Sequence, residues 1–328
     1  MLSYFFEGLT FRFIDLLLGF AILIKGADFL VNGSSSIAKK NGISNLAIGL
    51  TVVAFGTSMP ELIVSLLSSL NGKNDASFGN AIGSNNFNLL FILGVSGLIC
   101  PLIVQRNTVK YEVPLSLLAA GILFLLVNDN LIWGGENDVM SRFDSVILLL
   151  FFGGFLFYIY RTMKTSSDFS EGSEIKIYKT GLAVGMVILG LGFLIGGGTT
   201  VVNSATSIAQ HYGLSEKLIG LTILAMGTSL PELATSAVAA YRKNTDIAIG
   251  NVIGSNIFNI FFILGVTGVI SPMKYSSVMN FDLYVLMAST VVLMIFMFTL
   301  NQRKLDRWEA FMLLAGYITY TVYLIGME

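Results

Sequence analysis

The sequence is poor in charged residues. Of its 328 residues, 19 are Lys or Arg and 20 are Asp or Glu, so charged side chains make up 12% of the chain, about half the share usual in soluble domains. Such a chain cannot cover a soluble surface, which excludes an ordinary globular domain and a disordered chain. The net charge of −1 lacks the basic excess that nucleic-acid binding needs, so we expect no nucleic-acid partner.

The sequence also has little cysteine and histidine. A single cysteine, Cys100, excludes a disulfide framework and a cysteine-based metal site, and a single histidine, His211, excludes a histidine cluster. We interpret both residues as incidental, Cys100 at the end of a helix and His211 in a loop. Nothing in the sequence indicates a cofactor or a protein partner.

Apolar sequence is abundant: 54% of the residues are hydrophobic and 34 are glycine. A spanning helix needs about 20 mostly apolar residues, and membrane barrels instead alternate polar and apolar residues, which this chain does not do. We predict an all-α integral membrane protein in the lipid bilayer. Its ten transmembrane helices are expected at residues 13–32, 45–70, 78–99, 113–130, 145–162, 180–205, 218–241, 247–270, 282–300 and 308–326.

Basic residues are distributed unevenly between the loops. With ten spans, 13 Lys and Arg fall on one side and 5 on the other, and the richer side is normally cytoplasmic. We therefore predict a multi-pass protein of the cell membrane (the inner membrane in a prokaryote) with both termini outside. Trp133 and Trp308, near span ends, are expected at the membrane interface.

The sequence contains one strong internal repeat. At an offset of 171 residues, 49–101 returns as 220–272 with 28 of 53 positions identical and no gap, which indicates duplication. The polar segment 164–179 has the composition of a solvated cytoplasmic linker and separates the halves 1–163 and 180–328. Because each half holds five predicted spans, an odd number, we predict two inverted five-helix repeats, an architecture typical of secondary transporters.

The first duplicated motif places a carboxylate in the middle of a span. GTSMPE at 56–61 returns as GTSLPE at 227–232, and its proline displaces the carbonyl four residues earlier. A carboxylate at the bilayer centre costs at least about 2.5–3.5 kcal/mol on insertion scales, and no Lys or Arg lies mid-span beside Glu61 or Glu232. A bound cation is the natural partner, and two carboxylates match Ca²⁺, an ion with six to eight oxygen ligands. A protonated glutamate hydrogen-bonded inside the bundle is the alternative.

The second duplicated motif, GNAIGSNNFN at 79–88 and GNVIGSNIFN at 250–259, repeats polar residues every four positions along one helix face. Its glycines favour close helix packing, and its amide and hydroxyl oxygens suit Na⁺ or supplement a Ca²⁺ site. We favour ion ligation over interhelical hydrogen bonding for Ser84, Asn88, Ser255 and Asn259. The two interpretations remain balanced for Asn80, Asn85, Asn251 and Asn256.

The other polar residues of the predicted spans have simpler interpretations. Asp75 and Asp246 immediately precede a predicted helix, so we expect both to be N-caps. Asp15, Lys25 and Asp28 lie in the first span and are not duplicated. We expect these three to be interfacial or paired with one another.

These two motifs, each present twice, resemble the alpha-repeats of the cation/calcium exchanger superfamily, most closely prokaryotic sodium/calcium exchangers and their potassium-dependent relatives. The resemblance covers both repeats and the ten-span layout. It implies an antiporter that exchanges Ca²⁺ for Na⁺ by alternating access, with spans 1 and 6 rocking against the rest. By position, it implies Ca²⁺ ligation by Glu61, Glu232 and the carbonyls of Thr57 and Thr228. It implies Na⁺ ligation by the same glutamates together with Ser58, Ser84, Ser229, Ser255, Asn88, Asn259 and the carbonyls of Ala54 and Ala225.

Several alternatives stay open. Some members of the superfamily carry aspartate where this sequence has Asn259, so the Na⁺ stoichiometry and any K⁺ requirement are undecided. Ca²⁺/H⁺ exchange is the second hypothesis, because Glu61 and Glu232 could titrate when empty, although the histidine-containing motifs typical of proton-coupled relatives are absent. A cation channel is disfavoured by inverted duplication without a pore motif. An intramembrane enzyme would need a nucleophile, metal set or cofactor motif beside the two carboxylates.

Overall fold

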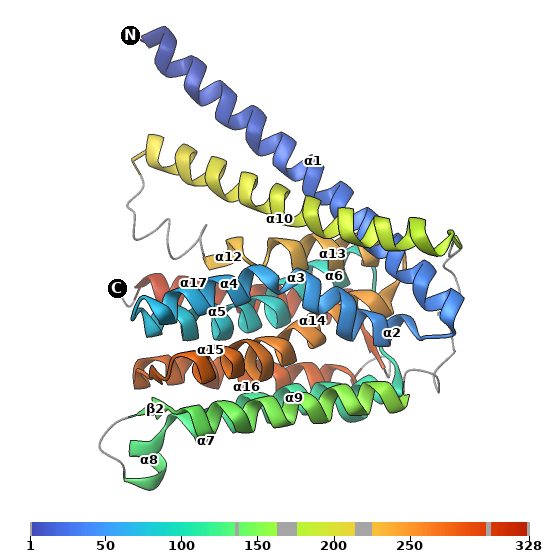
Figure 1. Cartoon of the computed structure of the whole chain (residues 1–328). Helices are drawn as coiled ribbons and strands as arrows, with labels where there is room; N and C mark the ends of the chain where they lie inside the picture. Colours follow the sequence, from blue (N-terminus) through green and yellow to red (C-terminus); the bar gives the residue numbers. More distant parts are fainter. Residues whose placement is uncertain (1, 135–137, 163–175, 214–224, 300–302, 327–328) are drawn as a thin grey trace.

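The computed structural model describes residues 2–134, 138–162, 176–213, 225–299 and 303–326, and nearly all of them are helical (Figure 1). The first half contains α1 (Leu2–Asn41), α2 (Asn45–Ile48), η1 (Gly49–Val53), α3 (Ala54–Thr57), α4 (Met59–Leu70), α5 (Asn74–Asn86), η2 (Phe87–Ile92), α6 (Leu93–Ile99), β1 (Leu102–Ile103), η3 (Thr108–Glu112), α7 (Val113–Val127), α8 (Asp129–Trp133), β2 (Val139–Met140) and α9 (Arg142–Thr162). The second half contains α10 (Thr180–His211), α12 (Ala225–Gly227), α13 (Leu230–Tyr241), α14 (Thr245–Ile257), η5 (Phe258–Leu264), α15 (Gly265–Ile270), β3 (Met273–Lys274), η6 (Ser277–Met279), α16 (Asn280–Phe296), β4 (Lys304–Leu305) and α17 (Arg307–Gly326).

Seven helical segments of the described residues are long and apolar enough to cross a membrane, and a bent pair makes an eighth candidate. The seven are Asn74–Ile99, Thr108–Val127, Arg142–Thr162, Thr180–His211, Thr245–Ile270, Ser277–Phe296 and Arg307–Gly326, and the bent pair is Asn45–Thr57 with Met59–Leu70. The prediction of a helical, multi-pass membrane protein is confirmed. Of the remaining predicted spans, 13–32 lies within α1, and 218–241 begins outside the described residues. The count of ten therefore stays a prediction.

The helices run lengthwise in one bundle, and the two ends of the chain lie at the same end of it (Figure 1). A short antiparallel sheet ties β2 to β3 at that end, with Val139 opposite Lys274. A second antiparallel sheet ties β1 to β4, with Leu102 opposite Leu305. Each sheet joins a strand of one half to a strand of the other, so the halves are clamped together.

Helices α1 and α10 pack against each other along much of their length and cover one side of the bundle (Figure 1). Their backbones meet at glycines: a Cβ on Gly190 would lie 2.8 Å from the carbonyl oxygen of Gly26, and one on Gly197 would lie 2.9 Å from that of Gly19. Later residues of α1 thus meet earlier residues of α10, so the pair is antiparallel. Small residues allow such close approach without a strong hydrophobic driving force in lipid.

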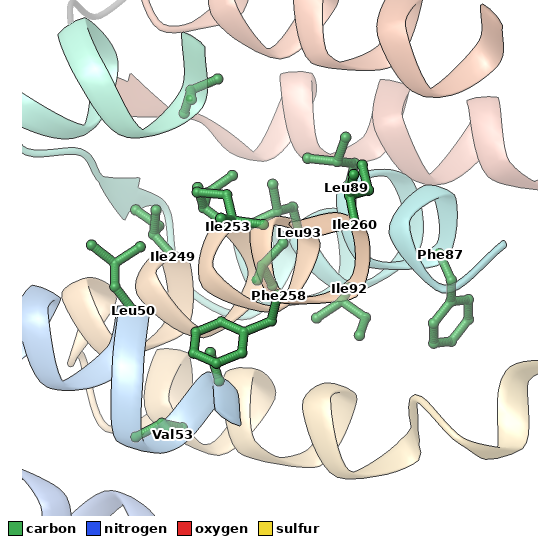
Figure 2. Packing of buried hydrophobic residues seen from close by; sticks show 14 of the residues in the cluster. Leu50, Val53, Phe87, Leu89, Ile92, Leu93, Ile249, Ile253, Phe258 and Ile260 are labelled. Carbon is green, nitrogen blue, oxygen red and sulfur yellow. The ribbon is translucent and has the colours of Figure 1, made fainter. Parts of the chain in front are cut away.

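The core is built from both halves around α14, all of whose residues are buried. Figure 2 shows Ile249 and Ile253 of α14 among side chains of η1, such as Leu50, and of η2 and α6, such as Ile92 and Leu93. Large apolar side chains are also exposed on the outer helices, including Leu17, Leu150, Phe157, Ile188 and Val322. Exposed apolar area of this extent is typical of a surface that contacts lipid.

Two predictions about helix caps are wrong. Helix α5 starts after Lys73, and Asp75 lies inside its first turn. Helix α14 is capped by Asn244, whose side chain accepts the Ile247 N–H. Asp246 is instead buried and accepts a hydrogen bond of 2.8 Å from Gln105 Nε2. An asparagine two residues earlier supplies the cap, which leaves the aspartate free for a tertiary contact.

One of the three charges of α1 has a partner that the sequence did not predict. Asp28 pairs with Arg242, just after α13, rather than with Lys25. The Lys25 ammonium lies over the Phe29 ring, 5.5 Å from its centroid. Asp28 therefore joins α1 to the opposite half instead of pairing within its own span.

The remaining minor predictions have mixed outcomes. His211 is the last residue of α10 rather than part of a loop. Cys100 follows the last residue of α6, as expected. Trp308 is exposed near the start of α17, and its place at the membrane interface stays a prediction. The Trp133 side chain and residues 164–175 of the linker lie outside the described residues.

The α1–α10 contact predicts a position-specific effect of adding one methyl group. Gly190→Ala would place a Cβ 2.7 Å from the Leu30 backbone nitrogen, and overpacking of this kind costs about 1–3 kcal/mol. Gly192→Ala is the matched control on the same helix, because its Cβ would meet nothing within 4 Å. Thermal unfolding in detergent should show a lower midpoint for Gly190→Ala only. Equal midpoints for the two variants would contradict this packing.

Candidate ion-binding site

Each GTS-PE motif lies at a break between two helices. The bent span turns by 46° between Thr57 and Met59, and Ser58 has φ −85° and ψ 9°. Ser229 has nearly the same angles, φ −90° and ψ 8°. In both halves the following helix has its proline at the first or second position, where the missing N–H costs nothing. The expected kink is therefore a complete break, and it opens a helix N-terminus beside the motif.

The two glutamates occupy the first turns of α4 and α13. Both are buried, with 1% of each residue exposed. Each carboxylate is held by the other half: Ser58 Oγ donates to Glu232 Oε1 at 2.8 Å, and Ser229 Oγ donates to Glu61 Oε1 at 3.0 Å. The positive end of each helix dipole favours a carboxylate there. The break thus brings both acids to one place between the halves.

The serines of the second motif complete the same cluster. Ser255 Oγ donates to Glu232 Oε1 at 3.4 Å. Ser84 Oγ lies 3.0 Å from Ser229 Oγ. Hydrogen bonds therefore connect both glutamates to a predicted serine from each motif.

Four buried side-chain oxygens of the predicted ligands, two from each half, have no hydrogen-bond partner. They are Glu61 Oε2, Glu232 Oε2, Asn88 Oδ1 and Asn259 Oδ1. Neither glutamate forms a salt bridge with a Lys or Arg in the described part of the chain. A buried charge without a partner costs several kcal/mol, and an unsatisfied amide oxygen costs about 1–3 kcal/mol. A hard cation bound among these oxygens would remove both penalties.

Hydrogen bonds to Asn85 and Asn256 orient two of these oxygens, those of Asn88 and Asn259. Asn88 Nδ2 donates to Asn256 Oδ1 at 3.0 Å, and Asn259 Nδ2 donates to Asn85 Oδ1 at 2.9 Å. Asn85 and Asn256 in turn donate to each other's backbone carbonyls at 3.1 and 3.3 Å. Because their own oxygens are engaged, Asn85 and Asn256 act as supports in this structure. The oxygens of Asn88 and Asn259 stay available.

Asn80 and Asn251 hold the motif helices in place. Asn80 Nδ2 donates to the Glu61 carbonyl at 3.0 Å and to Ser65 Oγ at 2.9 Å. Asn251 makes the equivalent bonds to the Glu232 carbonyl and Ser236 Oγ. For Asn80 and Asn251, the sequence left ion ligation and interhelical hydrogen bonding equally open. The contacts in the structure favour hydrogen bonding. The hydroxyls of Ser65 and Ser236 accept the second of these bonds in each half.

The threonines of the first motif bond to the same two asparagines. Thr228 Oγ1 donates to Asn80 Oδ1 at 3.2 Å, and Thr57 Oγ1 donates to Asn251 Oδ1 at 3.0 Å. Both threonine carbonyls lie at the helix breaks. The Ala54 carbonyl accepts the Ser58 N–H at 3.0 Å, a bond that uses one of the two lone pairs of this predicted ligand. Ala225 begins α12 and is the first described residue after 213.

A cavity of about 870 Å³ reaches the motif residues from one direction. Pro60, Asn80, Thr228 and Pro231 line it, as does Ile325 near the end of the chain. The cavity therefore extends toward the end of the bundle where the chain terminates (Figure 1). Glu61 and Glu232 are not among its lining residues, whereas Asn80, which donates to the Glu61 carbonyl, is.

Equivalent residues of the two halves differ in exposure along this path. Gly79 is exposed, and a Cβ on Gly79 or Gly83 would meet nothing within 4 Å. Their equivalents Gly250 and Gly254 are buried, where a Cβ would lie 3.0 Å from the Leu46 carbonyl oxygen and 2.9 Å from Leu50 Cα, respectively. The path along α5 is thus open, and the equivalent path along α14 is closed.

Known proteins are similar to this sequence over almost its whole length. A family model described as sodium/calcium exchanger protein matches residues 12–161 and 182–326. The putative antiporter CaxA of Alkalimonas amylolytica is 37% identical over 318 residues, covering 94% of this chain and 96% of that protein. The sodium/calcium exchanger MaX1 of Methanosarcina acetivorans is 30% identical over 355 aligned residues, covering 96% of this chain and 99% of that protein.

The fold is similar to that of a solved structure as well. A structure of the sodium-calcium exchanger NCX_Mj, soaked with 10 mM Na⁺ and zero Ca²⁺, aligns with a TM-score of 0.79 at 34% identity. The alignment covers 95% of this chain and 98% of that one. The likeness therefore extends to the whole arrangement of helices.

The unpartnered oxygens predict that cations stabilise the fold. An ion that binds only the folded state at 100 times its Kd adds about 2.7 kcal/mol to the free energy of unfolding. Thermal unfolding in detergent should shift upward with Ca²⁺ or Na⁺ and downward with a chelator in choline buffer. The double variant Glu61→Gln, Glu232→Gln should lose this dependence, because its amides carry no charge to neutralise. An unchanged ion response in that variant would contradict the site.

Proposed function

The chain belongs to the sodium/calcium exchanger protein family, and from this premise we propose that it is a secondary active antiporter that exchanges Ca²⁺ for Na⁺. The proteins it resembles are exchangers and antiporters, and the chain is a membrane protein of a family that transports inorganic cations. One observation carries the proposal: two buried carboxylates from opposite halves, each with a free oxygen, lie in one hydrogen-bonded cluster without a described countercharge.

Calcium would be held by Glu61, Glu232 and the carbonyls of Thr57 and Thr228. Two carboxylates neutralise the charge of Ca²⁺, and its flexible coordination accepts mixed carboxylate and carbonyl oxygens. The serine bonds leave one oxygen free on each glutamate. These are the charged ligands that a divalent ion needs.

Sodium would use the same glutamates with neutral oxygens around them. The proposed neutral ligands are Ser58, Ser84, Ser229, Ser255, Asn88, Asn259 and the carbonyls of Ala54 and Ala225. Filling these positions with Na⁺ would take the carboxylates away from Ca²⁺. Competition for shared ligands then couples the transport of the two ions. Bound Ca²⁺ or bound Na⁺ neutralises the carboxylates, whereas in the empty site they stay charged.

Alternating access would follow from an inverted duplication. We propose ten spans in two inverted halves, 1–163 and 180–328, joined by the linker 164–179, with the repeats 49–101 and 220–272 at the centre. The antiparallel α1–α10 pair and the one-sided cavity support this arrangement. Rocking of the α1–α10 pair against the bundle would close the path along α5 and open its equivalent along α14.

The membrane orientation follows from the basic residues. With the richer side in the cytoplasm of a prokaryotic cell, both termini lie outside the inner membrane. The cavity extends toward the end of the bundle where the chain terminates. The structure would therefore represent a state open to the outside.

Two other coupling ions remain as alternatives. Protons could replace Na⁺, because buried carboxylates without a cation favour their neutral form. Potassium dependence stays open, because Asn259 is neutral where some members of the superfamily carry aspartate, which leaves the site with two carboxylates. Both alternatives keep the same site: proton coupling changes the counter-ion, whereas a K⁺-dependent exchanger keeps Na⁺ as the counter-ion and needs K⁺ as well.

Counter-ion dependence of calcium flux distinguishes these possibilities. Proteoliposomes loaded with Na⁺ should take up labelled Ca²⁺ from a Na⁺-free buffer, and collapsing the Na⁺ gradient should stop the uptake. Vesicles loaded with K⁺ or with a pH gradient alone should show only background flux. Uptake driven by the pH gradient alone would replace Na⁺ exchange with H⁺ exchange, and conductance without a counter-ion would indicate a channel.

Neutralising either central carboxylate should abolish exchange. Glu61→Gln and Glu232→Gln preserve shape but remove the charge that Ca²⁺ requires, so Na⁺-driven Ca²⁺ uptake should fall to background. Asp15→Asn removes an exposed carboxylate on α1 and serves as the control with retained uptake. Normal uptake in either glutamine variant would disprove the proposed site.

A further inference from the structure

The wall of the cavity carries one charged side chain among its described lining residues. This residue is Asp282, in the first turn of α16. The other lining side chains are neutral, and most are apolar or small. A carboxylate on the wall of a low-dielectric cavity raises the local concentration of cations.

Asp282 is held in position by two contacts. Tyr320 of α17, which also lines the cavity, donates its hydroxyl to Asp282 Oδ1 at 2.6 Å. Asn86 Nδ2 donates to the Asp282 carbonyl at 3.0 Å. Asn86 directly follows Asn85 on α5, so Asp282 is tied to the helix that supports the ion site. The second carboxylate oxygen of Asp282 is not one of the described buried atoms that lack a hydrogen-bond partner.

The other half contains a similar carboxylate–tyrosine pair. Tyr158 of α9 donates its hydroxyl to Glu112 Oε1 at 2.5 Å. Glu112 is the fifth residue of the span Thr108–Val127, and Asp282 is the sixth of Ser277–Phe296. Glu112 is buried, and its Oε2 has no partner. Each half therefore places one acid near the start of the corresponding helix, against a tyrosine of a later helix.

The two pairs lie at opposite ends of the bundle. Asn128 and Asn280 exchange hydrogen bonds of 3.0 and 2.6 Å, which join the end of α7 to the start of α16. The two helices are therefore antiparallel, and Glu112, at the start of the α7 span, lies far from Asp282. The pair at the open end lines the cavity, and the pair at the closed end is buried.

We propose that Asp282, oriented by Tyr320, is a recruiting site that concentrates Na⁺ and Ca²⁺ in the open cavity before they reach Glu61 and Glu232. Glu112 with Tyr158 is its counterpart for the state that opens at the other end. The inference rests on the proposed exchange function and adds a binding step outside the central cluster. A first-turn carboxylate that only stabilises its own helix is the structural alternative.

The test measures the KM and kcat of Ca²⁺ uptake with Ca²⁺ presented to either face of proteoliposomes. Asp282→Asn should raise KM about threefold to tenfold from the cavity side at low ionic strength, with kcat within a factor of about two. The difference should shrink in concentrated choline chloride, because the Debye length falls from about 30 Å at 0.01 M to 3 Å at 1 M. Glu112→Gln should raise KM only from the opposite face.

Three further variants separate recruitment from structure. Asp282→Glu keeps the charge and should restore KM, and Tyr320→Phe should raise KM less than Asp282→Asn because the carboxylate remains. Asp129→Asn removes a carboxylate at the start of α8, away from the cavity lining, and should leave KM unchanged.

Several results would overturn the inference. They are an unchanged KM in Asp282→Asn, an equal rise in Asp129→Asn, a loss of kcat alone, or no restoration by Asp282→Glu. Each of these measurements compares a variant with the wild type, using whichever counter-ion drives Ca²⁺ uptake. If Na⁺ does not drive uptake by the wild type, the proposed function is wrong, and the recruiting site is tested separately.

Discussion

The structure is organised around two carboxylates buried without a described countercharge. Glu61 and Glu232 lie in the centre of a membrane protein, where a lone charge is costly, and each is approached by a serine from the other half. The helix breaks, the asparagine supports and the free amide oxygens all serve this pair. In the proposed function a bound cation neutralises this pair, and competition between two kinds of cation is the basis of exchange.

The halves are nearly identical in motif but not in environment. Gly250 and Gly254 pack against the backbone of α2 and η1, whereas nothing fills the space beside Gly79 and Gly83. Packed interfaces of this kind switch between discrete arrangements rather than deforming gradually. Two similar halves in different packings are what a protein needs to open at one end at a time.

The polar network explains why the site survives inside an apolar bundle. Asn85 and Asn256 satisfy each other's backbone and orient Asn88 and Asn259. Asn80 donates a hydrogen bond to the Glu61 carbonyl. Buried asparagines whose hydrogen bonds are all formed are stable in a low-dielectric interior. Buried oxygens without a partner destabilise the fold until an ion binds them. The free oxygens of Glu61, Glu232, Asn88 and Asn259 are therefore the positions that we propose for the ions.

The sequence by itself determined the membrane class and the duplication, and it singled out the glutamates and serines that the structure brings together in one cluster. Composition and hydropathy follow from the solvent that a chain must face, and a 171-residue repeat is visible without coordinates. Local patterns were less reliable: Asp75 and Asp246 resembled caps, but Asn244 caps α14 and Asp246 bonds to Gln105. Cap choice depends on a competition among neighbours that a spacing rule does not resolve.

Only the tertiary structure decided which polar atoms are engaged and which are free. Asn80 and Asn88 are equally polar in sequence, yet one supports a helix and the other leaves an oxygen unpartnered. The open path along α5 and the cavity position of Asp282 were likewise undetermined by sequence. The physical reason is that hydrogen-bond partners come from the opposite half, some 170 residues away in the chain. The glycines of the second motif are the same in both halves, so only the folded chain shows which path is open and which is closed.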